Sequence, residues 1–103
     1  MSDVLTRLEA VIAARKSADP EGSWTARLLS AGPGKCAEKF GEEAVEAIVA
    51  AASGDAAALR AEAADVLYHL LVMLAASDVA LADVLAELER REGTSGIAEK
   101  AGR

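Results

Sequence analysis

The sequence predicts an all-α domain, an antiparallel helical bundle of four main helices that is completed by homodimerisation. Hydrophobic residues make up 52% of the chain and aromatics only 3%, so core volume must come from Ala, Leu and Val. Alanine is the best helix former, whereas strands prefer β-branched and aromatic residues. The chain has 103 residues, so we expect a single domain, residues 1–103, with a modest core of its own.

The first predicted helix runs from Asp3 to Lys16, because its apolar residues recur at helical spacing. The run Asp19-Pro20-Glu21-Gly22 then has the composition of a turn, since Pro fixes φ and Gly permits a positive φ. Ser23 is expected to cap a short helical turn that ends at Leu29.

The second helix is predicted from Pro33 to about Ala52, since proline is tolerated in a first helical turn. Gly54 suits the position after its end, and Asp55 suits the N-cap of a third helix over 56–76. So short a connection makes the two helices antiparallel neighbours.

The third helix is hydrophobic all round after Ala63, which indicates burial on most sides. In so small a chain this burial implies a dimer core. A fourth, amphipathic helix is expected to open at Asp78 or Leu81 and to end near Arg91.

Charge and composition exclude several classes of protein. The net charge is −6 and the pI is about 4.7, so the chain repels nucleic acids and anionic membranes. The most apolar stretch, Ala63 to Ala76, is shorter than the roughly 20 residues that a membrane span needs. One cysteine, Cys36, cannot form an internal disulfide, and the N-terminus lacks a secretory signal, so we expect a cytoplasmic protein.

Four carboxylates carry the functional prediction. Glu43 and Glu46 are three residues apart, as are Glu62 and Asp65, so each pair lies on one side of its helix. Glu46 lies roughly 12 Å before the turn at Gly54 and Glu62 roughly 12 Å after it, at a rise of about 1.5 Å per residue. Antiparallel packing therefore makes the two pairs face each other.

Clustered carboxylates repel one another unless protons or cations neutralise them. Oxygen ligands select hard ions, so Mg²⁺ is the expected cofactor and Mn²⁺ a possible substitute. Such a site suits hydrolysis of a phosphoanhydride in a nucleotide. Lys35 and Lys39 precede the first pair and could neutralise phosphate charge, and Glu42 could serve as a further ligand or as a base.

Structural explanations compete with these roles. Acidic residues on helices are often solvated or paired with lysine, as Glu43 could be with Lys39. Asp65, however, opens the most apolar run of the chain, where an unpaired carboxylate is hard to explain. His69 could touch the metal site, but a lone histidine on an apolar helix is more often a satisfied core residue. We expect Cys36 to be a small buried side chain.

The run 32–46, GPGKCAEKFGEEAVE, followed by the run 62–71, EAADVLYHLL, resembles the phosphoribosyl-ATP pyrophosphohydrolase family. The resemblance extends to Arg15-Lys16, to 19–25 and to 89–97. It implies hydrolysis of phosphoribosyl-ATP to phosphoribosyl-AMP and diphosphate, the second step of histidine biosynthesis, by a Mg²⁺-dependent homodimer or higher homo-oligomer. The residues implied are Glu43, Glu46, Glu62 and Asp65 for metal, Glu42, Glu43 and Glu46 for catalysis, and Arg15, Trp24, Thr25, Lys35 and Lys39 for substrate.

Three alternatives stay open. Trp24 either stacks on a base or anchors its loop. A housekeeping pyrophosphohydrolase acting on non-canonical nucleoside triphosphates would use the same four carboxylates. A non-enzymatic helical dimerisation module would explain the apolar third helix but not the clustered acids.

Overall fold

The computed structural model describes residues 3–93, and that part of the chain is helical and contains no strand. The all-α prediction is therefore confirmed. The first helix ends two residues earlier than expected, where the chain tightens into a 3-10 turn, and the short turn expected after Ser23 is a full α-helix. The elements are α1 Asp3–Ala14, η1 Arg15–Ser17, α2 Trp24–Ala31, α3 Pro33–Ala52, α4 Ala56–Ala76 and α5 Leu81–Arg90.

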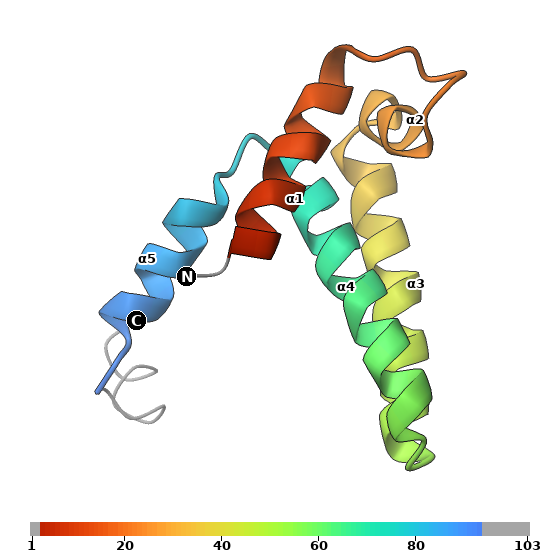
Figure 1. Ribbon diagram of the computed structural model, residues 1–103, viewed down its shortest axis with the longest axis vertical. Helices are drawn as coiled ribbons and strands as arrows, with labels where there is room; N and C mark the ends of the chain where they lie inside the picture. The colour runs from red at the N-terminus through yellow and green to blue at the C-terminus, as the bar shows by residue number, and fades with distance from the viewer. Residues whose placement is uncertain (1–2, 94–103) are drawn as a thin grey trace.

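The two longest helices, α3 and α4, form an antiparallel hairpin (Figure 1). Pro33 occupies the start of α3, where its missing N–H would have no helical partner anyway. Gly54 adopts a φ of +72° and turns the chain. The Asp55 side chain then accepts a hydrogen bond from the Ala58 N–H at 3.0 Å and caps α4. The predicted hairpin and its turn are confirmed.

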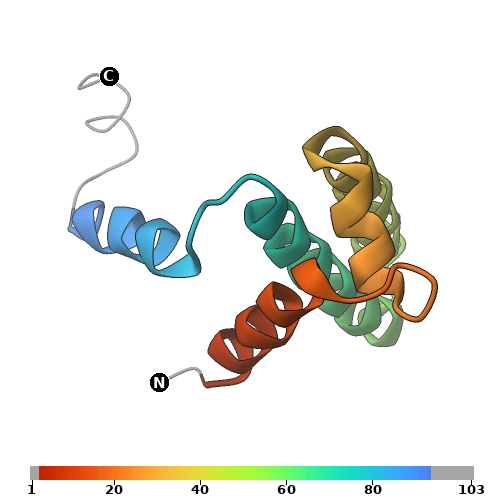
Figure 2. The same cartoon turned by 90° about the horizontal axis from the view of Figure 1, so that it is seen from above.

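The hydrophobic core lies at the end of the hairpin opposite the Gly54 turn. There α1 packs on the second half of α4, and α2 packs on both α3 and α4 (Figures 1 and 2). The second half of α4, which the sequence assigns to a dimer core, is thus largely buried within one chain. The most buried members of this core are Ile12, Leu28, Cys36, Leu71, Val72 and Leu81.

Helix α5 stands apart from the other helices (Figure 2). Its base is fixed to α1, because Glu9 Oε2 accepts a hydrogen bond from the Leu81 N–H at 2.8 Å. Lys16 also pairs with Asp78 at 2.9 Å. Beyond this base Leu85 and Leu88 are 46% and 56% exposed. The predicted fourth main helix therefore exists, starting at Leu81, but within one chain it does not join the bundle.

Part of the apolar surface of the hairpin is also uncovered within one chain. Val45, Ile48 and Val49 of α3 and Leu67 of α4 are exposed although all four are apolar. Over residues 3–93 no single helix is long and apolar enough to cross a membrane. Only α4 and α5 taken together pass that test of length and composition, across a bend of 108°.

Candidate active site

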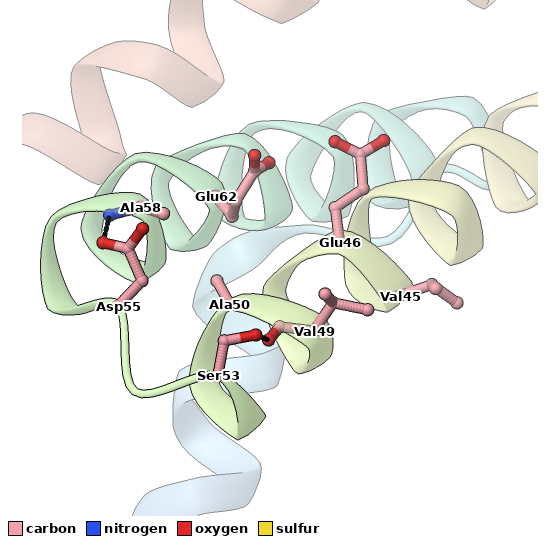
Figure 3. Close-up of a pocket in the computed structure, with 8 residues that line it drawn as sticks. All are labelled: Val45, Glu46, Val49, Ala50, Ser53, Asp55, Ala58 and Glu62. Atoms are coloured by element: carbon pink, nitrogen blue, oxygen red, sulfur yellow. Dashed lines mark hydrogen bonds between the residues drawn. The ribbon is translucent and has the colours of Figure 1, made fainter.

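The hairpin brings the two predicted carboxylate pairs together. One carboxylate oxygen each from Glu43, Glu62 and Asp65 lies within 4.8 Å of the other two. Glu46 adjoins them, and Figure 3 shows its carboxylate and that of Glu62 rising from facing helices on the same side of the hairpin. We call Glu43, Glu46, Glu62 and Asp65 the acidic cluster. Its assembly follows from three-residue spacing on two antiparallel helices.

The cluster is electrostatically strained without a counter-charge. Partial burial raises the pKa of Glu43, and the charges of Glu46 and Asp65 raise it further. Burial likewise raises the pKa of Glu62, followed by the charges of Glu46, Asp65 and Glu43. Glu62 Oε1 is also buried without a hydrogen-bond partner. Each of these features favours a bound proton or cation at the cluster.

A groove of about 370 Å³ runs from the cluster toward the turn of the hairpin (Figure 3). Val45, Val49, Ala50 and Ala58 give it largely apolar walls. Of its three acidic side chains, Asp55 is occupied as the cap of α4. Glu46 and Glu62 are therefore the groove's available carboxylates.

The predicted basic residues lie on α3, and both pair with acids one turn ahead. Lys35 Nζ lies 2.6 Å from Glu38, and this hydrogen bond raises the pKa of Lys35. Lys39 Nζ lies 3.3 Å from Glu42 and 6.0 Å from the ring centroid of Trp24. Glu42 is thus paired with Lys39, outside the group of three oxygens, and its role as ligand or base stays a prediction.

The Trp24–Thr25 segment opens α2. Ser23 Oγ accepts a hydrogen bond from the Ala26 N–H at 3.1 Å, which caps the helix as expected. The Thr25 hydroxyl is hydrogen-bonded to the hydroxyl of Tyr68 on α4. Trp24 is 51% exposed beside Lys39. The segment is anchored through Thr25, and about half of the indole stays exposed.

Arg15 is not brought to the acidic cluster. It lies in η1 and lines a separate shallow pocket of about 330 Å³ with Asp19 and Ser23. The predicted contact of Arg15 with substrate stays a prediction. The matched run 89–97 lies only partly within the described residues, since 94–97 fall outside them.

Sequence reasoning missed Tyr68, whose only signal was its position three residues after Asp65. His69 is 8% exposed, and its ring meets that of Tyr68 edge to face with centroids 4.9 Å apart. His69 is therefore a core residue as expected, but it is not a satisfied one, because its Nδ1 is buried without a hydrogen-bond partner. Cys36 is buried as predicted and donates to the Leu28 carbonyl at 3.2 Å, and burial raises the pKa of its thiol.

Fold and site together define an all-α protein that carries a carboxylate cluster on a helical hairpin. The family model described as phosphoribosyl-ATP pyrophosphohydrolase matches residues 5–92. The chain is 78% identical to a phosphoribosyl-ATP pyrophosphatase of Dinoroseobacter shibae, over 97% of this chain and 98% of the relative. It is 76% identical to a protein of that name from Cereibacter sphaeroides, over 97% of each chain. It is 72% identical to another from Rhodobacter capsulatus, over 96% of each.

The chain belongs to the phosphoribosyl-ATP pyrophosphohydrolase family, as its sequence motifs imply.

Proposed function

We propose that this chain hydrolyses phosphoribosyl-ATP to phosphoribosyl-AMP and diphosphate in histidine biosynthesis, with the reaction centred on the acidic cluster. Membership of the family and close identity to proteins named for this activity support the substrate. The observation that supports the site is the gathering of three carboxylate oxygens within 4.8 Å of one another. We expect the reaction to take place in the cytoplasm, where free nucleotides are made and used.

The donor set fits a divalent cation. All its donors are anionic oxygens, the raised pKa values of Glu43 and Glu62 reflect uncompensated negative charge, and Glu62 Oε1 has no partner. Hard cations of the Mg²⁺ type prefer such oxygens. Glu43, Glu46, Glu62 and Asp65 would hold Mg²⁺, or Mn²⁺ as a substitute. When bound, this ion would neutralise charge on the phosphate oxygens.

The residues around the cluster suggest how the chain handles its substrate. Glu46 is exposed at the edge of the cluster, a position that supports a role in accepting a proton from the attacking water. Lys39 lies one turn before Glu43 on α3 and 6.0 Å from the ring centroid of Trp24, a position from which its charge can contact phosphate oxygens. The exposed part of the Trp24 indole suits stacking on the adenine ring.

A second copy of the chain completes the fold in this proposal. The hairpin exposes Val45, Ile48 and Val49, and α5 exposes Leu85 and Leu88. Contiguous exposed apolar surface of this kind marks sites of protein association. Homodimerisation would bury both surfaces and add cover to a small core.

The direct test is a steady-state assay of diphosphate release from phosphoribosyl-ATP with Mg²⁺, beside a panel of free nucleoside triphosphates. We expect phosphoribosyl-ATP to be preferred and chelation of the metal to stop turnover. Asp65→Asn should abolish activity, whereas Glu21→Gln, which removes an exposed charge in the turn before α2, should leave it unchanged. Preference for a free triphosphate would instead support a housekeeping enzyme.

A further inference from the structure

A second pocket, separate from the acidic cluster, lies at the turn between α1 and α2. It has a volume of about 330 Å³, which is at the lower end of the roughly 300–1,000 Å³ of small-molecule sites. We call it the Arg15 pocket, and its lining residues are Arg15, Ala18, Asp19, Gly22 and Ser23. Three of these five residues have polar side chains that can bind a ligand.

Backbone hydrogen bonds hold the walls of the Arg15 pocket in place. The Ala18 N–H donates to the Arg15 carbonyl at 3.1 Å, which closes the turn at the end of η1. The Gly22 N–H donates to the Asp19 carbonyl at 3.0 Å, which closes the next turn. Asp19 Oδ1 also accepts a hydrogen bond from the Glu21 N–H at 2.9 Å. A pocket that is formed in advance in this way loses little entropy when a ligand binds.

The polar side chains of the pocket keep capacity for further hydrogen bonds. Over residues 3–93 the Arg15 guanidinium has no hydrogen-bond or ion-pair partner. In the same part of the chain Asp19 uses only Oδ1, for the Glu21 N–H, so its Oδ2 stays available as an acceptor. Ser23 Oγ accepts from the Ala26 N–H and can still donate its own O–H. The pocket therefore offers a cation, an acceptor and a donor.

These three groups match the chemistry of a ribose phosphate. Arginine binds phosphate oxygens through paired, charge-assisted N–H donors. A carboxylate oxygen accepts hydrogen bonds from ribose hydroxyls, as it does in dinucleotide-binding proteins. A simple anion would bind Arg15 but would be repelled by the Asp19 carboxylate. The mixed lining therefore favours a sugar phosphate over a simple anion.

The Arg15 pocket is continuous with the part of α2 that contacts the hairpin. Ser23 lines the pocket and is followed by Trp24 and Thr25 at the start of α2. The Thr25 hydroxyl is hydrogen-bonded to the hydroxyl of Tyr68, which lies one turn after Asp65 on α4. The start of α2 thus joins the pocket to the helix that carries half of the acidic cluster.

The proposed substrate has its chemical groups in a corresponding order. Phosphoribosyl-ATP carries the triphosphate at one end, the adenine in the middle and a second ribose, with its own phosphate, on the far side of the adenine. The acidic cluster suits the triphosphate, and the exposed part of the Trp24 indole suits the adenine. The Arg15 pocket, which adjoins the Trp24 segment, is then the place for the second ribose and its phosphate.

We propose that the Arg15 pocket binds the ribosyl phosphate of phosphoribosyl-ATP, with Arg15 on the phosphate and Asp19 on the ribose hydroxyls. This contact distinguishes the substrate from ATP, which lacks that group. The inference rests on the proposed function, since it assigns one part of the substrate named there. Because the ribosyl phosphate is remote from the bond that is cleaved, its contacts act on substrate binding more than on the chemical step.

The first test compares two substrates on two proteins. The substrates are phosphoribosyl-ATP and ribosyl-ATP, an analogue that keeps the second ribose but lacks its phosphate, and the proteins are the unaltered chain and Arg15→Gln. Arg15→Gln should lower kcat/KM for phosphoribosyl-ATP about 10–100-fold, mainly through KM, because it removes a charge-assisted contact. The loss for ribosyl-ATP should be much smaller, because that analogue has no phosphate for Arg15 to bind. Equal losses on both substrates, or no loss on either, would overturn the proposal.

Two further variants sharpen the result. Arg7→Gln removes another exposed arginine, on α1, and should change kcat/KM for neither substrate. Asp19→Asn keeps an oxygen that can accept from the Glu21 N–H but replaces the available carboxylate oxygen with an amide. It should lower kcat/KM for both substrates by a similar factor, because both carry the second ribose. Unchanged values in Asp19→Asn would overturn the assignment of Asp19 to the ribose.

The outcomes for the two proposals are distinct. If the unaltered protein releases no diphosphate from phosphoribosyl-ATP with Mg²⁺, the proposed function fails. If it releases diphosphate but uses ribosyl-ATP equally well, only the assignment of the Arg15 pocket fails. The assignment is supported if the unaltered protein prefers phosphoribosyl-ATP and Arg15→Gln loses that preference while Arg7→Gln keeps it.

Discussion

Without metal, the Asp65→Asn variant should be more stable than the unaltered protein. With Mg²⁺ present, it should be the less stable of the two. The substitution preserves the size of the side chain and removes one negative charge from the acidic cluster. The carboxylate oxygens lie within 4.8 Å of one another, and like charges about that far apart repel by about 1 kcal/mol when water screens them, as it does at the exposed Asp65. The same charge is a predicted ligand, so its loss should weaken cation binding.

The size of both effects can be worked out. Relief of repulsion should raise the free energy of unfolding of the metal-free variant by about 1 kcal/mol. For a chain of this length that change corresponds to a rise in Tm on the order of 4–8 °C. Mg²⁺ at 100 times its Kd should then stabilise the unaltered protein by about 2.7 kcal/mol and the variant much less. The variant is therefore the more stable protein without metal, and the unaltered protein is the more stable one with Mg²⁺.

Urea unfolding followed by circular dichroism, at one protein concentration, measures the effect with chelator and with Mg²⁺. Glu21→Gln is the control, because it also removes one negative charge but lies in the turn before α2. It should change neither the metal-free stability nor the gain from Mg²⁺. The reasoning is refuted if metal-free Asp65→Asn is less stable than the unaltered protein, or if Mg²⁺ stabilises both equally.

Three further predictions use other parts of the fold. Leu71→Ala removes a side chain that is 3% exposed and should lower the free energy of unfolding by about 2–5 kcal/mol in urea titration. The pKa of Glu43 in the folded protein is raised above its ordinary value of 4.5, so its contribution to stability is fully present below pH 4.5 and is lost as the pH rises through the raised pKa. The urea midpoint of the metal-free protein should therefore fall over this range of pH, and Mg²⁺ should oppose the fall. Leu88→Glu should dissociate the proposed dimer, giving monomer mass by light scattering, whereas the exposed Ala82→Glu should not.

The helical hairpin was predictable because its signals are local. Pro33, Gly54 and Asp55 each set a backbone conformation or a cap at a fixed place, and the structure uses all three as expected. The length of α2 was underestimated, because eight residues make too few helical turns to show a clear hydrophobic period in the sequence. The place of α5 was not predictable, since its apolar stripe is the same whether it packs on its own chain or on another.

The candidate site also has one part that the sequence predicts and another that it does not. Glu43, Glu62 and Asp65 meet because helical spacing and a short turn determine their positions. The bond between Thr25 and Tyr68 joins residues 43 positions apart, and two hydroxyls at such a separation leave no pattern in a sequence. The pairing of Lys39 with Glu42 rather than with Glu43 was equally open, because both acids lie within one turn of the lysine.

All four carboxylates of the acidic cluster lie on one continuous stretch of chain, the α3–α4 hairpin, whose two helices are joined by three residues. Such local contacts form early in folding, because closing a short loop costs little entropy. The cluster can therefore assemble before α1 docks on α4 or a second copy binds. A cation that binds to this hairpin would stabilise the folding transition state as well as the final structure. Mg²⁺, the cation proposed for the cluster, should then accelerate refolding and not only slow unfolding.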